Sequence, residues 1–345
     1  MREREIQGVI IATPQNLRYL TGFTGEEGYL LVDEQESSLL VDGRYATQAL
    51  EETHACQPVL LEHGTKGVAA FLSSRNLQRV GVEAEGFSAA VFHQLRESTP
   101  ESEMVLLTDE LSRLRGIKTA EEIAWIREAV DIAERAWKEV VAKVAVGVSE
   151  HSLALELEFE MRRRGSEGVA FDIIVASGSR TSLPHARPTD RTLEAGDFIT
   201  FDFGARWQGY CSDETCTVSL GAPSPRQRDI YTIVREAHDR AIDRVKPGVP
   251  LSDIDAAARE HIVSRGFGDR FSHGTGHGVG LAVHEWPVVG NESKEIAEEG
   301  MVFTIEPGIY LPGWGGVRIE DMVRVTGGGY EVLTTISKGM MILGA

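Results

Sequence analysis

An internal repeat in the second two thirds of the chain constrains the fold more than any other feature. One helix-length segment ends at Gly147 and the next at Gly165, and the same arrangement returns at Gly248 and Gly266. Both intervals are 18 positions long. A repeated unit buries its apolar face by packing against its copy. The sequence therefore predicts one domain built from two similar halves, related by a pseudo-twofold axis.

Strand-like segments follow each helix pair, and these segments repeat as well. Residues 196–204 read GDFITFDFG, and residues 300–308 read GMVFTIEPG. Aligning the two places Asp202 and Glu306 at the same position, each inside an otherwise apolar strand. A carboxylate buried in such a strand is costly unless it is paired or binds a metal. Two acids at equivalent positions therefore predict a site between the halves.

Each of these acids is followed by a glycine-containing turn and a returning segment that carries another acid. The second acid is Asp213 in the first half and Glu320 in the second half, where the turn is three residues longer. Four converging carboxylates would repel one another strongly without a cation. Hard divalent metals prefer such oxygen ligands, and two metals sharing bridging carboxylates would neutralise the cluster.

Histidine supplies the nitrogen ligand that the acids lack. His277 lies in the glycine-dense segment 273–280, HGTGHGVG, where backbone can pack closely around an imidazole. His284 follows seven residues later, and His185 lies between two prolines. A lone histidine is more often an ordinary surface or core residue than a ligand. Three of the ten histidines beside glycine and proline turns favour a functional site.

The first third of the chain predicts a separate, smaller α/β unit. A capping box, Thr119 with Glu122, begins a helix with apolar residues at helical spacing, so we place the domain boundary near residue 115. Within this smaller unit, a helix is expected to begin at Thr13 and Pro14. The predicted strands of this unit are 8–12, 28–32, 38–41 and 80–83, the middle two forming a hairpin.

Composition and charge exclude several classes of function. The net charge of −18 repels phosphate backbones, so nucleic acid is not expected as a partner. No apolar run reaches the roughly 18 residues of a membrane span. The opening Met1-Arg2-Glu3-Arg4-Glu5 lacks the apolar stretch of a signal peptide. Three cysteines without a CxxC pair indicate a reducing compartment, and we expect a cytoplasmic protein.

Six short segments contain most of the residues singled out above: TFDFG, SDET, HGTGHGVGL, VHE, TIEPGIY and VRIED. In this order they resemble the pita-bread metallopeptidases, and within them the aminopeptidase P and prolidase branch. NLRYLTG at 16–22 and DGRY at 42–45 resemble the creatinase-like N-terminal domain of that branch. The resemblance implies an α+β protein: a smaller α/β creatinase-like domain over 1–115 and a pseudo-twofold pita-bread catalytic domain over 116–345.

The resemblance also implies the metal ligands. Asp202 should chelate one metal ion, and Asp213 should bridge both ions. His277 and Glu306 should hold the other ion, and Glu320 should bridge again. Mn²⁺ is the first choice for four carboxylates and one imidazole, with Zn²⁺, Co²⁺ and Fe²⁺ as alternatives.

Catalytic roles follow from the same resemblance. A hydroxide between the two metals would attack the substrate, and Glu306 would take its proton and pass it to the leaving nitrogen. His185 and His284 would position the scissile carbonyl and stabilise the oxyanion. Arg318 would orient the bridging acid two residues after it. Tyr310 is expected to line the substrate site, although a packed strand tyrosine is an equally good interpretation.

This branch cleaves the bond before proline, which calls for an apolar pocket around the pyrrolidine ring. We consider Phe171, Trp286 and Trp314 as candidates for this pocket, with plain core packing as the alternative. A strict dipeptidase must also recognise the terminal carboxylate of its substrate, usually with an arginine. Prolidase-like members are expected to carry a basic residue directly after the segment HEWP, where this chain has Val288.

Val288 favours an Xaa-Pro aminopeptidase, which releases the N-terminal residue from peptides with proline in second position. Xaa-Pro dipeptidase (prolidase) remains the alternative, because Arg187 or Arg44 could serve a carboxylate. A methionine aminopeptidase would lack the N-terminal domain, and a creatinase would not use the metals. A non-catalytic peptide-binding module is a further alternative, which five intact ligands argue against. A homodimer is expected.

Overall fold

The computed structural model describes residues 5–344, which divide into two compact units between Arg115 and Gly116. No helix within residues 5–344 combines the length and apolarity that crossing a membrane requires. The charged residues that argued against a signal peptide lie outside the described residues, except for Glu5.

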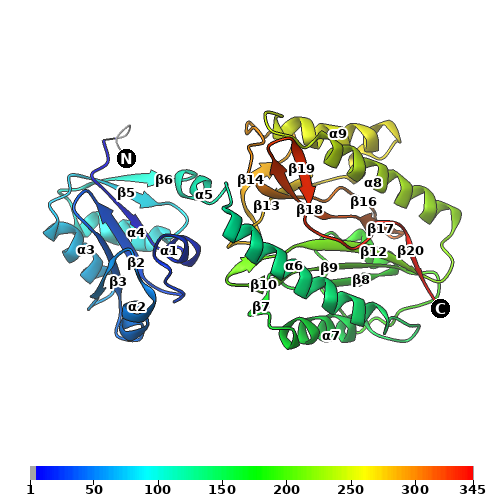
Figure 1. Ribbon diagram of the computed structural model, residues 1–345, viewed down its shortest axis with the longest axis horizontal. Coiled ribbons are helices and arrows are strands. Elements are labelled where there is room, and N and C mark those ends of the chain that lie inside the picture. The colour runs from blue at the N-terminus through cyan, green and yellow to red at the C-terminus, as the bar shows by residue number, and fades with distance from the viewer. Residues whose placement is uncertain (1–4, 345) are drawn as a thin grey trace. The chain divides into compact units, whose positions relative to one another are not determined.

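A six-stranded mixed sheet forms the centre of the N-terminal unit (Figure 1), with the strand order β4-β3-β2-β1-β5-β6. Helices α1 and α2 pack on one face of this sheet and α3 and α4 on the other, each pair covering its own apolar cluster. The elements are β1 (Gly8–Ile11), α1 (Pro14–Thr21), β2 (Tyr29–Asp33), β3 (Ser37–Val41), α2 (Ala46–Glu52), β4 (Gln57–Leu60), α3 (Thr65–Ser74), β5 (Arg79–Glu83), α4 (Ala89–Ser98), β6 (Glu103–Leu107) and α5 (Glu110–Leu114).

The four predicted strands of this unit and the β2–β3 hairpin are confirmed. Helix α1 begins at Pro14, as expected, but the side chain of Thr13 does not cap it. The Thr13 hydroxyl instead donates to the buried carboxylate of Glu83 at 2.6 Å, and that carboxylate also accepts the Thr13 backbone N–H at 2.8 Å. A carboxylate from β5 therefore holds the start of α1 in place of a capping side chain.

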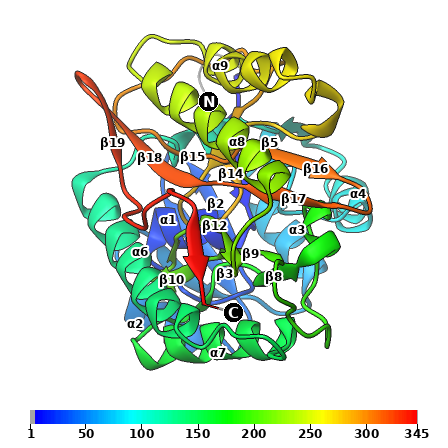
Figure 2. The same ribbon diagram turned by 90° about the vertical axis from the view of Figure 1, so that its right-hand side faces the viewer.

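Two helix pairs enclose the sheets of the C-terminal unit (Figures 1 and 2). Helices α6 and α7 pack on the four-stranded sheet β20-β12-β9-β8, and α8 and α9 pack on the five-stranded sheet β14-β13-β15-β18-β19. The elements are α6 (Ala120–Val141), α7 (Glu150–Arg163), β7 (Gly168–Val169), β8 (Ile174–Ser177), η2 (Gly178–Ser182), β9 (Phe198–Phe203), β10 (Ala205–Trp207), β11 (Tyr210–Cys211), β12 (Glu214–Leu220), α8 (Pro225–Arg244), α9 (Leu251–Ser264), η3 (Gly268–Arg270), β13 (Gly276–Gly278), β14 (Glu285–Val289), β15 (Val302–Ile305), β16 (Gly308–Leu311), β17 (Gly315–Arg318), β18 (Asp321–Thr326), β19 (Gly329–Val332) and β20 (Met341–Leu343).

The backbone confirms the predicted repeat. The two long helices α6 and α8 both begin with a capping box. Glycines at equivalent chain reversals share a left-handed backbone conformation, which any other residue would adopt at a cost. Their φ values are 89° at Gly147 and 83° at Gly248, 97° at Gly165 and 83° at Gly266, and 91° at Gly196 and 92° at Gly300.

The repeat places two antiparallel strand pairs side by side at the centre of the unit. Strand β9 pairs with β12 in the first half, and β15 pairs with β18 in the second half. Across the seam, the backbone N–H of Glu320 donates to the carbonyl of Thr215 at 3.2 Å. The acids predicted to be ligands lie in these strands or directly beside them.

Candidate metal centre and active site

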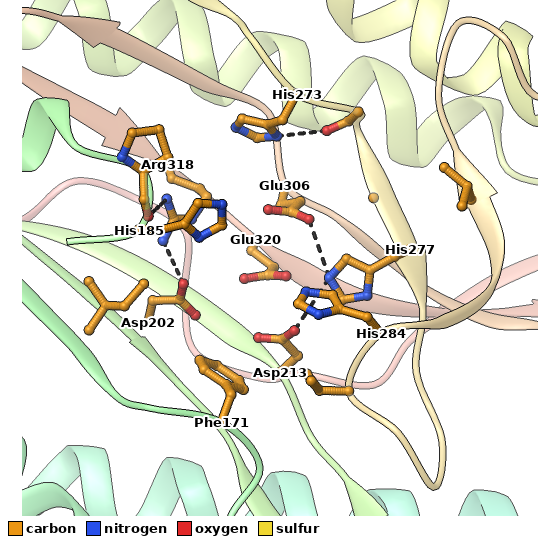
Figure 3. A pocket seen from close by; sticks show the side chains of 16 residues that line it. Phe171, His185, Asp202, Asp213, His273, His277, His284, Glu306, Arg318 and Glu320 are labelled. Carbon is orange, nitrogen blue, oxygen red and sulfur yellow. Dashed lines mark hydrogen bonds and ion pairs between the residues drawn. The ribbon is translucent and has the colours of Figure 1, made fainter. Parts of the chain in front are cut away.

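A cavity of about 360 Å³ opens between the two halves (Figure 3). We call it the site cavity. Its walls come from both repeats and bring together eight of the nine predicted site residues, Tyr310 being the exception. The lining residues are Phe171, Ile174, Pro184, His185, Asp202, Asp213, His273, Gly274, Gly276, His277, Val283, His284, Val288, Glu306, Arg318 and Glu320.

Three of these residues form a cluster able to hold a metal ion. One ligand atom each from Asp213, His277 and Glu320 lies within 4.8 Å of the other two. Asp213 directly precedes β12, Glu320 directly precedes β18, and His277 lies in β13. Duplicated hairpins therefore deliver one carboxylate each to the same point, as the repeat predicts.

The imidazole of His277 is prepared for coordination through its Nε2 atom. Its Nδ1 lies 3.1 Å from the Gly278 carbonyl oxygen and donates to it, which leaves Nε2 as the free acceptor. Nε2 lies 3.6 Å from Asp213 Oδ2 and 3.4 Å from Glu306 Oε1. Burial, with a contribution from nearby His284, lowers the pKa of His277 to about 4. The ring is neutral at physiological pH, as a metal ligand must be.

Close backbone packing explains the glycines around His277. A Cβ atom on Gly276 would lie 1.8 Å from the carbonyl oxygen of Thr304 in the adjacent strand β15. One on Gly278 would lie 2.3 Å from the Trp286 carbonyl oxygen. Side chains at these positions would push β13 away from its neighbours and move the imidazole out of the cluster.

Burial also raises the pKa values of acids in the site. It raises the pKa of Asp213 and of Glu306 well above the usual value, and in both cases the charge of Glu320 adds to the rise. Burial and Asp202 together raise the pKa of Glu320 to about 7, although Arg318 and Lys338 oppose the rise. A cation that binds these acids therefore competes with protons at a higher pH than it would at exposed carboxylates.

Asp202 stands apart from the three-residue cluster and is held by Arg318. The Arg318 Nη2 atom donates to Asp202 Oδ2 at 2.5 Å, and Asp202 Oδ1 is buried without a hydrogen-bond partner in the described structure. An unpaired buried carboxylate oxygen that faces a cavity is a ready ligand for a cation. The donor set of four carboxylates and one imidazole therefore fits divalent metal ions.

Arg318 contacts one proposed ligand directly and another through a threonine. Its guanidinium binds Asp202 directly and reaches the bridging acid only through a hydroxyl: Arg318 Nε donates to Thr215 Oγ1 at 3.0 Å, and Thr215 donates to Glu320 Oε2 at 2.7 Å. Asp202 in β9 lies across the seam, within direct reach of the guanidinium.

Tyr310 does not line the site cavity, contrary to expectation. Its hydroxyl lies 2.9 Å from His273 Nε2 and accepts from Arg318 Nη1 at 3.1 Å, so the ring is buried behind the wall. His273, which we did not select, does line the cavity, and burial lowers its pKa to about 4. Its place in the same glycine-dense segment as His277 was the available signal.

His185 and His284 lie at the solvent-exposed part of the site cavity. The His284 ring lies 4.2 Å from the His277 ring at a steep angle, and Figure 3 shows both beside the carboxylates. Burial is the main cause that lowers the pKa of His284. Both imidazoles are placed to meet a ligand that enters from solvent.

The apolar part of the cavity differs from the predicted proline pocket. Phe171 lines it, together with Ile174, Val283 and Val288. Trp314 lies elsewhere, beneath the guanidinium of Arg226, and Trp286 packs against the core of the second half. The sequence around a motif does not show against which part of the protein a nearby aromatic side chain packs.

Two threonines complete the site and were not predicted. Thr215 connects Arg318 to Glu320, as described above, and Thr304 Oγ1 accepts the His277 backbone N–H at 3.1 Å. Thr304 Oγ1 also lies 3.5 Å from Glu306 Oε1. Both threonines lie two positions from a predicted ligand, and the two-residue period of a strand puts them on the same face.

Two duplicated halves that close over buried carboxylates and a neutral imidazole define a metallohydrolase with the pita-bread fold. Residues 124–327 match the metallopeptidase family M24, and residues 1–117 match the creatinase/prolidase N-terminal domain. The chain belongs to metallopeptidase family M24. It is therefore a metallo-exopeptidase, and its family uses divalent metal ions.

Relatives cover the chain from end to end. An Xaa-Pro dipeptidase of Pyrococcus furiosus is 39% identical over 342 residues, which is 99% of this chain and 97% of the relative. The structure of an Xaa-Pro dipeptidase from Bacillus anthracis has a TM-score of 0.94 at 38% identity, covering 99% and 96% of the two chains. An X-Pro aminopeptidase structure from Thermotoga maritima has a TM-score of 0.88 at 36% identity, covering 99% of each chain.

Proposed function

We propose that this protein is an Xaa-Pro dipeptidase that hydrolyses the bond between an N-terminal residue and proline. The observation that carries the proposal is the site cavity, where Asp213, His277 and Glu320 converge beside Asp202 and Glu306. Relatives that match almost the whole chain, in Pyrococcus furiosus and Bacillus anthracis, are named Xaa-Pro dipeptidases.

The cavity would hold two divalent ions. Asp202 and Asp213 would bind one, His277 and Glu306 the other, and both Asp213 and Glu320 would be shared. Mn²⁺ suits this oxygen-rich set best, with Zn²⁺ or Co²⁺ as alternatives. When bound, the ions supply Lewis acidity to the carbonyl and make water a stronger nucleophile at neutral pH.

Glu306 is the proposed proton carrier. Its buried carboxylate has a raised pKa, so it can take a proton from the attacking water and then release it. Water adds to the carbonyl carbon, the C–N bond breaks, and the proline nitrogen receives the proton from Glu306. That nitrogen has no N–H in the substrate, and the site needs no acceptor for one.

The remaining residues bind and orient the substrate. His185 and His284, at the exposed part of the cavity, would position the carbonyl and stabilise negative charge on its oxygen. Phe171, Ile174 and Val283 offer an apolar wall for the pyrrolidine ring. Arg318 keeps Asp202 in place and acts as a positioning residue rather than as a substrate contact.

Relatives favour dipeptidase activity, whereas Val288 in the sequence favours an aminopeptidase. An Xaa-Pro aminopeptidase is the second candidate. Val288 lines the cavity at the position where a dipeptidase is expected to have a basic residue that binds the substrate carboxylate. Arg318, the arginine that lines the cavity, is already bound to Asp202. Arg187 is exposed outside the lining, and Arg44 pairs with Asp42 and Glu27 in the other unit.

A peptide panel tests the proposal. Protein loaded with Mn²⁺ is incubated with Xaa-Pro dipeptides and with matched Xaa-Pro-Yaa tripeptides, and kcat/KM is measured for each. We expect higher kcat/KM for the dipeptides. Cleavage of tripeptides alone would establish the aminopeptidase instead. No cleavage with Mn²⁺, Zn²⁺ or Co²⁺ would support a non-catalytic peptide-binding module.

A further inference from the structure

A buried lysine lies behind the proposed metal centre, outside the site cavity. Lys338 belongs to the segment between β19 and β20, and 4% of its side chain is exposed. Its ammonium forms an ion pair with Glu214 and lies 3.3 Å from Asp321 Oδ1. Both acids are almost fully buried, so one cation serves two carboxylates within the protein interior.

The two partners of Lys338 are the residues that directly follow two proposed ligands. Glu214 follows Asp213 at the start of β12, and Asp321 follows Glu320 at the start of β18. Successive side chains of extended backbone point to opposite sides. The ligands therefore face the site cavity while their neighbours face away from it, toward Lys338.

These two strands come from different halves and different sheets. Strand β12 belongs to the four-stranded sheet and β18 to the five-stranded sheet. The backbone hydrogen bond from Glu320 to Thr215 crosses the seam at this point. The ion pairs of Lys338 with Glu214 and Asp321 cross the same seam, directly behind the ligands. Attraction between buried charges is strong, because little solvent screens it.

The segment that carries Lys338 is itself fastened to both halves. The Thr335 backbone N–H and hydroxyl both donate to Glu134 of α6 in the first half. The Thr334 hydroxyl donates to Asp321, and His238 Nε2 of α8 lies 3.0 Å from Asp321 Oδ2 in the second half. The lysine is thus presented from a fixed backbone rather than from a free end.

We propose that Lys338 is a positioning residue for the metal pair, which sets the separation between Asp213 and Glu320 by tying together Glu214 and Asp321. This inference rests on the proposed function, in which Asp213 and Glu320 are shared by both ions. Without the ammonium, Glu214 and Asp321 lose the shared partner that joins them across the seam. The ligands in front of them then move apart, and one ion loses a bridging oxygen.

Lys338→Met tests this proposal, with Lys143→Met as the matched control. Lys143 pairs with Glu156 on the surface, where 47% of each side chain is exposed. Mn²⁺ binding is measured by calorimetry, and the metal pair by electron paramagnetic resonance. We expect wild type and Lys143→Met to bind two ions and show an exchange-coupled Mn²⁺ pair. Lys338→Met should bind the second ion about 10- to 100-fold more weakly, as for other groups that support ligands, and lose the coupled signal.

A merely structural lysine would change the unfolding temperature but not these readouts. Kinetics separate the roles further, because a displaced metal lowers kcat while KM for the dipeptide stays near the wild-type value. If Lys338→Met does not fold, the double variant Glu214→Gln/Lys338→Met tests the proposal instead. It removes the cation and one acid and leaves Asp321 with His238 and Thr334, so it should fold and still show the weakened second ion.

Two outcomes overturn different claims. If wild type binds two Mn²⁺ ions and both Lys338 variants keep its affinity and its coupled spectrum, the positioning role of Lys338 is wrong and the metal centre stands. If folded wild-type protein binds fewer than two ions, the proposed metal centre itself is wrong.

Discussion

At the scale of single residues, burial determines the proton content of the site before any ion enters. The pKa of Glu320 is raised to about 7, whereas that of His277 is lowered to about 4. Below pH 7 a metal must displace the proton of Glu320, whereas His277 stays neutral between about pH 4 and 7. The acid and the imidazole therefore have opposite shifts, and of the two only the acid has a proton that competes with a metal near neutrality.

We predict that Mn²⁺ affinity rises with pH up to about 7 and changes less above it. Below this pH each unit should weaken binding by about tenfold for the one proton that Glu320 releases, with Asp213 and Glu306 adding to the effect in the same direction. Calorimetry in buffers of different ionisation enthalpy measures both affinity and protons released. Affinity that stays constant between pH 6 and 8 would contradict the raised pKa values.

Glu306→Gln should separate metal binding from turnover. The amide keeps the shape of the carboxylate and one ligand oxygen but cannot carry a proton. We expect a folded, metal-binding protein whose kcat falls by at least about 10²-fold, the usual contribution of general acid–base catalysis. Steady-state kinetics on an Xaa-Pro dipeptide measure the loss. A kcat within a few-fold of wild type would remove Glu306 from the proton transfer.

Arg318→Met should disturb Asp202 rather than the substrate. Asp202 loses its partner at 2.5 Å and Tyr310 loses one of its two hydrogen bonds, so metal affinity or kcat should fall about 10- to 100-fold. Arg127→Met, which removes an exposed arginine paired with Glu331, is the matched control. A rise in KM with metal affinity and kcat unchanged would instead indicate that Arg318 contacts the substrate.

At the scale of elements, strand β13 depends on a contact that only glycine permits. Gly276→Ala would place a Cβ atom 1.8 Å from the Thr304 carbonyl oxygen, so β13 and β15 must separate. We expect a loss of roughly 3 kcal/mol in the free energy of unfolding, together with weaker metal binding through His277. Gly328→Ala, where no atom lies within 4 Å of the new Cβ, is the control. Equal chemical-denaturation midpoints for the two variants would contradict this account.

The helix pairs show how elements reach their positions from local rules. Capping boxes at Thr119 and Ser224 begin the two long helices, and left-handed glycines end the shorter ones. These devices act within a few residues of the chain, so each can be recognised without knowledge of the partner element. Strand pairing around the site is the same in both halves, with β9 antiparallel to β12 and β15 antiparallel to β18.

At the scale of the whole molecule, metal binding should stabilise the fold. Ions that bind the native state and not the unfolded chain add about 2.7 kcal/mol when present at 100 times their dissociation constant. We expect Mn²⁺ to raise the unfolding temperature in scanning calorimetry and a chelator to reverse the change. Asp213→Asn, which removes charge from a shared ligand, should show little response to Mn²⁺. A full response in that variant would exclude Asp213 from the centre.

Sequence alone identified the repeat and eight of the residues that line the site cavity, and its motifs resembled a family with this fold class. It could do so because buried acids at equivalent repeat positions, glycine reversals and strand alternation are all local patterns. The four carboxylates and the imidazole can also be read directly from the sequence, since the identity of their donor atoms does not depend on the packing.

Tertiary structure decided which of these groups touch. Arg318 binds Asp202, 116 positions away, instead of the acid beside it, and Tyr310 is turned behind the wall by His273 and Arg318. Lys338 meets Glu214 and Asp321 only because two sheets meet at a seam. Contacts of this kind are set by how the two halves pack, and a local pattern along the chain contains no record of that packing.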